Sequence, residues 1–219
     1  MLGRPASHTI DGPVGLLEVV VEEPVEPARL QGLAVIAHPN PLQGGTMDNK
    51  VVHTLVRAFA LAGWRAVRFN FRGVGKSEGT HDHGEGEVDD LLAVLADART
   101  DPALRGLPVA LAGFSFGGGV AAKAHARWRE TAGSDAAALV LVSPAVTRLS
   151  VPDVPAHTLV VEGEQDDVVP LDAILNWARP QALPVAVVPG VGHFFHGQLP
   201  VLRELVRRHL QGLPPAASL

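Results

Sequence analysis

Short apolar segments alternate with amphipathic segments along this chain, and the alternation limits the folds that it can adopt. Apolar runs of strand length, such as Leu33–Ala37 and Ala138–Val142, are separated by longer segments with apolar residues at helical spacing. Strands with almost no polar positions are typical of a parallel sheet that is covered on both faces. The pattern therefore predicts an α/β fold of three layers, with helices on both faces of a mostly parallel, twisted sheet.

The predicted elements follow one another without an internal repeat. We expect strands at Thr9–Asp11, Leu16–Val21, Leu33–Ala37, Arg65–Asn70, Pro108–Ala112, Ala138–Val142, Thr158–Val161 and Pro184–Val188. We expect helices at Asp48–Ala62, Glu87–Ala98, Gly117–Arg129, Leu171–Arg179 and Gln198–His209. Asp48 should cap the first helix, and the first two strands should pair with each other. We predict one domain over residues 1–219, with a flexible tail over residues 211–219.

The composition argues against several classes of protein. A net charge of −5 without a basic stripe gives no sign of nucleic-acid binding. The absence of cysteine excludes disulfides, thiolate metal sites and a cysteine nucleophile. The first residues lack the apolar run of a signal peptide, and no apolar stretch approaches the ~20 residues of a membrane span. We therefore expect a cytoplasmic protein with no membrane partner, and the sequence leaves its oligomeric state open.

A G-x-S-x-G motif links a predicted strand directly to a predicted helix. The motif runs Gly113-Phe114-Ser115-Phe116-Gly117 and follows Pro108–Ala112. Strand before and helix after are the context of a nucleophile elbow, a sharp turn that lifts a serine hydroxyl clear of the sheet. Bulky side chains two residues on either side of Ser115 would collide in such a turn. The alternative is a glycine-rich turn with an incidental serine, but the context favours Ser115 as the nucleophile.

A serine nucleophile needs a base and an acid that orients the base. In α/β-hydrolases the acid follows the serine along the chain and the histidine comes last. The acid should lie in the loop after Thr158–Val161, where Asp166 and Asp167 compete. Asp166 is our choice, because Asp167 also reads as a solvated loop carboxylate or a helix cap. Glu162 and Glu164 are outside candidates.

The base should lie in the loop after Pro184–Val188. His193 follows a glycine in a tight loop, whereas His196 lies nearer the final helix and fits a structural or exposed role better. His125 falls inside the helix that follows Ser115, where histidines are more often packed or exposed than catalytic. We therefore predict His193 as the base.

An acyl-transfer site also needs two backbone donors for the oxyanion. One should be the N–H of Phe116, the residue after the nucleophile. The second should come from the loop after Leu33–Ala37, where two prolines have no N–H to give and Asn40 or Leu42 remains. We favour Asn40, and we expect His38 to brace this loop by hydrogen bonding. The expected apolar lining of the cleft comes from Leu42, Phe114, Phe116, Phe194 or Phe195.

Four motifs together resemble those of a small α/β-hydrolase family described as serine hydrolases or carboxylesterases, which is similar in outline to the dienelactone hydrolases. They are His38-Pro39-Asn40-Pro41-Leu42 with residues 44–52, Phe69–Gly79, Gly113–Gly118 and Gly192–Gly197. The resemblance covers nearly the whole chain and implies the triad of Ser115, Asp166 and His193. Asn40 departs from the pattern, since relatives often carry a second histidine there. This change leaves the backbone donor in place.

Two other motifs look functional but lack the necessary context. Gly75-Lys76-Ser77 suggests a phosphate loop, yet the glycine expected five residues earlier is Asn70. His81-Asp82-His83 could bind a metal, but no third ligand is evident. We therefore expect neither a cofactor nor a metal.

These features predict a serine esterase without a lid that cleaves small acyl esters through an acyl-enzyme intermediate. The connection from Ser143 to His157 carries three prolines in fifteen residues and is too short for a cap domain. The open alternatives are a thioesterase or an acyltransferase with the same triad. A different class is a catalytically silent scaffold that binds a ligand.

Overall fold

The computed structural model describes residues 5–27 and 30–213. Within these ranges one sheet contains eight strands: β1 (His8–Gly12), β2 (Gly15–Glu22), β3 (Gly32–Ala37), β4 (Trp64–Phe69), β5 (Val109–Phe114), β6 (Ala138–Val142), β7 (Leu159–Gly163) and β8 (Val185–Val188). The α-helices are α1 (Lys50–Leu61), α2 (Gly86–Ala98), α3 (Phe116–Ala132), α4 (Leu171–Ala178) and α5 (Leu199–Gln211). None of the helices in the described ranges combines the length and the apolar character that crossing a bilayer requires.

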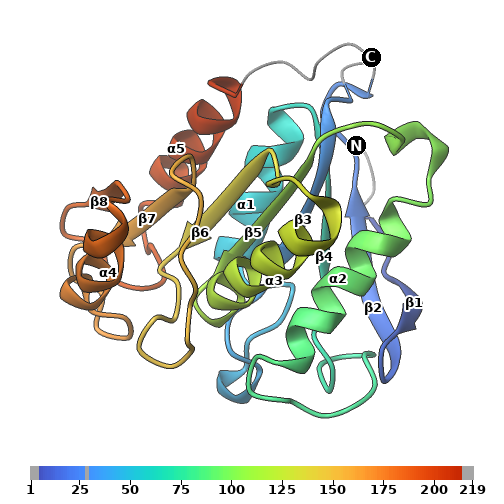
Figure 1. Ribbon diagram of the computed structural model, residues 1–219, viewed down its shortest axis with the longest axis horizontal. Helices are drawn as coiled ribbons and strands as arrows, with labels where there is room; N and C mark the ends of the chain where they lie inside the picture. The colour runs from blue at the N-terminus through green and yellow to red at the C-terminus, as the bar shows by residue number, and fades with distance from the viewer. Residues whose placement is uncertain (1–4, 28–29, 214–219) are drawn as a thin grey trace.

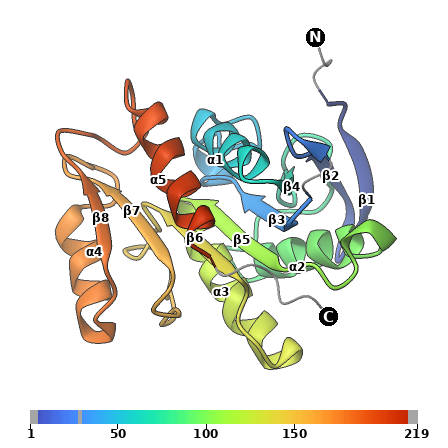
Figure 2. The ribbon, with the colours of Figure 1, turned by 90° about the horizontal axis from the view of Figure 1, so that it is seen from above.

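The strands lie in the order β1-β2-β4-β3-β5-β6-β7-β8. The six strands from β4 to β8 in this order are parallel, and β2 pairs antiparallel with both β1 and β4. Helices α1 and α5 cover one face of the sheet, while α2, α3 and α4 cover the other (Figures 1 and 2). The predicted three-layer α/β fold is therefore confirmed.

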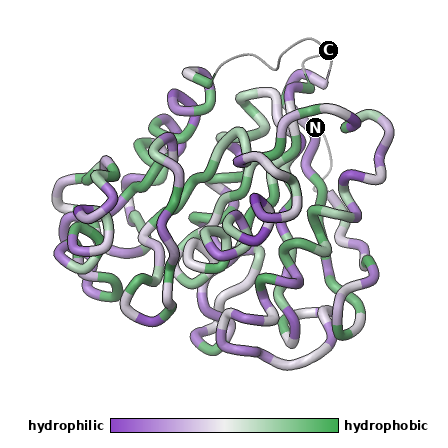
Figure 3. Tube along the Cα trace, in the orientation of Figure 1, coloured by the Kyte–Doolittle hydropathy of each residue, from purple (hydrophilic) through white to green (hydrophobic). Residues whose placement is uncertain are grey.

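Side chains that alternate along the central strands supply both hydrophobic cores. In β5, Leu111 packs with α2 and α3, whereas Ala112 and Phe114 pack with α1 and α5. Figure 3 shows hydrophobic residues along the central strands and hydrophilic residues on the outer turns of the helices. Burial on both faces explains why these strands read as continuous apolar runs.

The structure shifts several predicted boundaries by one to three residues and corrects one cap. Asp48 does not cap α1, because the helix begins at Lys50 and Asn49 accepts the N–H of Val51 at 2.8 Å. Gln211, expected in the tail, is the last residue of α5. Gly212 caps this helix, and residues 214–219 of the predicted tail lie outside the described residues.

The strand order reverses between β3 and β5. After β3 the chain moves outward to β4, and it then returns to place β5 on the other side of β3. Ligands of open α/β sheets bind beyond the carboxyl ends of the strands at such a switch point. Ser115 directly follows β5 and Asn40 lies three residues after β3, so both belong to this end of the sheet.

A buried ion pair fixes the loop between β4 and α2 against the helix. The Arg72 guanidinium donates to Asp90 Oδ1 at 2.7 Å and to the Gly86 carbonyl at 2.6 Å. The carboxylate of Asp90 also accepts the Arg72 backbone N–H at 3.0 Å. Because Asp90 is fully buried and Arg72 is only 6% exposed, the loss of one partner leaves the other charge buried without compensation.

We expect Asp90→Ala to destabilise the protein by about 3–5 kcal/mol, measured by chemical unfolding, because it strands the Arg72 charge. Asp89→Ala is the matched control, since Asp89 lies on the exposed side of the same helix and pairs with the half-exposed Arg127. Loss of that surface pair should cost less than about 1 kcal/mol. Equal effects of the two substitutions would contradict this role for the buried pair.

Candidate active site

Ser115 stands at a tight turn between β5 and α3. Its φ of 56° lies in the left-handed region, which is unusual for a residue with a side chain. A Cβ atom at Gly113 would lie 2.1 Å from the Gly117 carbonyl oxygen, and one at Gly117 would lie 2.4 Å from the His38 carbonyl oxygen. Both glycines are therefore required by the close approach of backbones. The turn has the geometry of a nucleophile elbow.

Ser115, His193 and Asp166 form a continuous chain of hydrogen-bond contacts. His193 Nε2 lies 3.0 Å from Ser115 Oγ, and His193 Nδ1 lies 2.6 Å from Asp166 Oδ2. The three residues are only 4–7% exposed, although Ser115 and His193 line an open cleft. The predicted base is thus within hydrogen-bonding reach of both the predicted nucleophile and the predicted acid.

Asp166 is held by backbone donors as well as by the imidazole. Its Oδ1 accepts the N–H groups of Val168 at 2.9 Å and Val169 at 2.8 Å, which leaves Oδ2 for His193. Burial opposes the ionisation of Asp166, but hydrogen bonds from His193, Glu162 and the Val169 N–H outweigh burial and lower its pKa to about 2. Asp166 is therefore a carboxylate at neutral pH.

Over the described residues, none of the competing candidates forms a hydrogen bond with Ser115 or His193. Asp167 is exposed at the rim of the cleft, and His196 is exposed beside the Phe194 ring. Glu164 accepts the Gly190 N–H at 2.7 Å and joins two loops. His125 accepts the Ala136 N–H at 3.3 Å, near the start of β6, at the end of the sheet opposite to Ser115.

The expected bracing role of His38 is confirmed. Its Nε2 accepts the Phe71 N–H at 3.1 Å, so Nδ1 carries the proton and donates to the Pro39 carbonyl at 2.6 Å. Burial lowers the pKa of His38 to about 4, which keeps the imidazole neutral. The ring therefore ties the loop after β3 to the loop after β4.

The backbone positions predicted to hold an oxyanion differ in their availability. The Leu42 N–H already donates to the Asn40 side chain at 2.9 Å. Over residues 5–27 and 30–213, the N–H groups of Asn40 and Phe116 have no hydrogen-bond acceptor. Asn40 lines the cleft together with Ser115. These two groups are free to bind a ligand, whereas the N–H of Leu42 is occupied.

The cleft beside Ser115 has a volume of 470 Å³ and a wall of mixed polar and apolar character. Its lining residues are Pro39, Asn40, Gln43, Gly44, Gly45, Asn49, Ser115, Arg148, Asp167, Val168, His193 and Phe194. Sequence analysis did not identify Gln43, Asn49 or Arg148 as part of the site. They come from loops whose path the apolar pattern does not determine. The one signal for them in the sequence is that each loop follows a strand, β3 for Gln43 and Asn49 and β6 for Arg148.

Of the five residues predicted to line the cleft, only Phe194 does so, and the buried Phe116 is among the four that do not. Phe114 and Phe195 are fully buried, and Leu42 is exposed outside the cleft. The Phe114 ring instead packs against His193 from behind, with 4.8 Å between the ring centres. Phe194 is 45% exposed and does line the cleft. Phe195 has a φ of 52°, and this backbone twist turns its side chain into the core while Phe194 faces outward.

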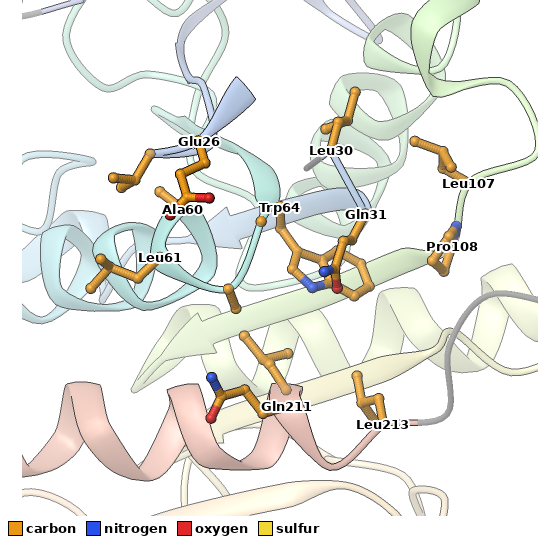
Figure 4. A pocket seen from close by; sticks show the side chains of 14 residues that line it. Glu26, Leu30, Gln31, Ala60, Leu61, Trp64, Leu107, Pro108, Gln211 and Leu213 are labelled. Carbon is orange, nitrogen blue, oxygen red and sulfur yellow. The ribbon is translucent and has the colours of Figure 1, made fainter. Parts of the chain in front are cut away.

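A second cavity, of 710 Å³, lies at the other end of the sheet. It is formed around Trp64 at the start of β4, between the ends of α1 and α5 (Figure 4). Among its lining residues, all in the described ranges, there is no serine or histidine. Within the same ranges no group of three His, Asp or Glu side chains could hold a metal ion.

Comparison with known proteins identifies the family. The family model for serine aminopeptidases of the S33 type matches residues 41–160. An α/β serine hydrolase homologue from Coxiella burnetii is 39% identical, with 96% of this chain and 99% of that chain covered and a TM-score of 0.80. A serine hydrolase without a lid from Xanthomonas campestris is 37% identical, with coverages of 98% and 97% and a TM-score of 0.85. The chain belongs to the lidless α/β serine hydrolases.

A more distant solved structure shares the fold of this hydrolase. Est1E from Butyrivibrio proteoclasticus, determined with ferulic acid bound, is 18% identical and has a TM-score of 0.79, with coverages of 94% and 98%. The lidless character is visible in the hydrolase itself, because residues 143–157, between β6 and β7, contain neither helix nor strand. This finding agrees with the prediction from the prolines of that connection.

The two adjacent phenylalanines of the histidine loop should respond differently to truncation. Phe195→Ala should cost about 3–5 kcal/mol of unfolding free energy, because it empties a buried site. Phe194→Ala should leave the unfolding free energy nearly unchanged, because its ring is half exposed in the cleft. Chemical unfolding of both variants tests the prediction. A larger loss of stability for Phe194→Ala would mean that the loop faces the other way.

Proposed function

We propose that this hydrolase cleaves small acyl esters, with Ser115 as nucleophile, His193 as base and Asp166 as orienting acid. The observation that carries the proposal is the contact chain from Ser115 Oγ through His193 to Asp166 at 3.0 and 2.6 Å. A serine hydroxyl at its ordinary pKa attacks a carbonyl poorly. A neutral imidazole at hydrogen-bond distance can remove the hydroxyl proton during the attack and so activates the serine.

In the proposed mechanism, His193 Nε2 removes the Ser115 proton as Oγ attacks the ester carbonyl. Asp166 keeps the Nδ1 proton of His193 in place and stabilises the imidazolium that forms. The oxyanion accepts hydrogen bonds from the free N–H groups of Phe116 and Asn40. His193 then gives its proton to the departing alcohol. Water, activated by the same imidazole, attacks the acyl-enzyme and releases the acid.

Ester cleavage has rivals that use the same chemistry. A thioesterase releases a thiol, an acyltransferase passes the acyl group to an alcohol instead of water, and a silent scaffold releases nothing. The matched serine aminopeptidase model adds amide cleavage as a further outcome. We favour small esters because the cleft is open and short. The ferulic acid bound to Est1E is one small carboxylic acid that a protein of this fold accommodates.

One substrate series separates these outcomes. The same short acyl group is offered as an ester, a thioester and an amide, with and without a competing alcohol. A preference for the ester, with free acid as the main product, supports the proposal. Covalent labelling of the hydrolase by a fluorophosphonate, followed by peptide mass spectrometry, should place the label on Ser115. No label and no turnover would point to the silent scaffold.

Substitutions in the triad should abolish turnover of an activated ester. Ser115→Ala should lower kcat by on the order of 10³-fold or more, and Asp166→Asn by roughly 10⁴-fold, because an amide presents an N–H to His193 Nδ1 and reverses the tautomer. Asp167→Asn is the matched control and should keep nearly full activity. A crippled Asp167→Asn variant beside an active Asp166→Asn variant would overturn the assignment of the acid.

Activity should depend only weakly on acyl chain length. A fully buried methylene contributes about 0.8 kcal/mol, but an open cleft of only 470 Å³ leaves most of a long chain in water. We expect kcat/KM to change little across soluble esters of increasing length, with no jump where the substrates aggregate. A steep rise with chain length would reveal an acyl tunnel that opens in solution.

A further inference from the structure

Glu162 is a buried carboxyl group that the proposed mechanism does not use. It belongs to β7, whose other side chains are apolar, and it is 0% exposed. By alternation along the strand it lies on the same face as Val160, which packs against Val169 and Ile174 under α4. Burial of an unpaired charge among such neighbours is very unfavourable, so the state of this carboxyl needs an explanation.

The contacts of Glu162 differ between its two oxygens. Oε1 accepts the Ser143 hydroxyl at 3.0 Å and the Gly163 N–H at 3.0 Å. Over the described residues, Oε2 is buried and receives no hydrogen bond from any donor. An ionised carboxylate would leave this oxygen unsatisfied. A protonated oxygen is a donor, and the carboxylate of Asp166 is the acceptor that interacts with Glu162.

The two carboxyl groups divide their charge unequally. Burial and the neighbouring Asp166 raise the pKa of Glu162 to about 9, while the pKa of Asp166 is lowered to about 2. Two carboxylates that share one buried site cannot both ionise without strong repulsion, so one of them keeps its proton. Asp166 has the imidazole and two backbone donors, which favours its charged form. Asp166 acts on Glu162 both through a hydrogen bond and through its charge.

We propose that Glu162 is a positioning residue, a neutral carboxylic acid that donates its proton in a hydrogen bond to the Asp166 carboxylate and holds it toward His193. The chain of contacts then runs from Ser143 through Glu162, Asp166 and His193 to Ser115. Glu162 does not line the cleft, so it acts through Asp166. This inference rests on the proposed function, because it assigns Asp166 as the acid of the triad.

Two variants of similar size separate donation from packing. Glu162→Gln keeps an acceptor for Ser143 and replaces the O–H donor with an N–H donor, while Glu162→Met keeps the length of the side chain without either group. We expect Gln to retain kcat within about threefold and Met to lower kcat by roughly 10- to 100-fold, the scale of one hydrogen bond to a charged group. KM should change little in both. Equal loss in both variants would overturn the proposal.

The pH dependence of stability tests the proton without any assay of activity. The folded protein keeps the Glu162 proton up to pH about 9, while the unfolded chain releases it above its ordinary pKa of 4.5. Wild-type stability should therefore fall between these values, relative to the Gln variant, which has no proton to lose. The difference in Tm between Glu162→Gln and wild type should grow in favour of Gln from pH 5 to pH 8. A constant difference would show that Glu162 is not protonated.

A spectroscopic signal tests positioning independently of turnover. The Nδ1 proton of His193, bonded to Asp166, should give a downfield proton resonance in NMR that Asp166→Asn removes. This resonance should persist in Glu162→Gln and shift or broaden in Glu162→Met. If the esters are not cleaved but both physical signals behave as stated, the proposed function fails while the Glu162 contact stands. If turnover is normal but the resonance is unchanged in both Glu162 variants, the positioning role is wrong while the proposed function stands.

Discussion

The first turn of α3 approaches the end of β5 so closely that no side chain fits between them. Gly113 and Gly117 make this approach possible, and Gly117 also lies against the His38 carbonyl of the neighbouring loop. One contact thus joins the strand, the helix and the loop after β3. Because Ser115 is held between the two glycines, its backbone strain is stabilised by the packing of three elements. The cleft, the free N–H groups and the reach of His193 all depend on this contact.

The apolar pattern was enough to predict the elements and the order of the site loops. Strands such as Ala138–Val142 are buried on both faces, so their composition alone identifies them. The elbow could be predicted because it lies where one strand meets one helix. The choice of Asp166 over Asp167 agrees with the structure, in which the backbone of the loop offers N–H groups to the first carboxylate and leaves the second in water.

Other parts of the site depend on information that no local pattern contains. Phe194 and Phe195 have the same chemistry, and only the positive φ at Phe195 decides which ring enters the core. Asn49 caps α1 in place of Asp48 because the loop after β3 ends, and the helix begins, at Lys50. Glu162 was only an outside candidate for the acid in the sequence. Its hydrogen bond with Ser143, 19 residues earlier and directly after β6, became visible only in the fold.

The chain completes the proposed catalytic triad late in the sequence. Ser115 and His193 are 78 residues apart, and the loop that carries His193 follows β8, the last strand of the sheet and one of its two edges. Pairing of parallel strands that are far apart in sequence carries a large loop-closure cost and is slow. Under the proposed function, a chain whose β8 has not yet docked has no base beside Ser115. The reactivity of Ser115 toward a covalent probe would therefore report that β8, the edge strand, has joined the sheet.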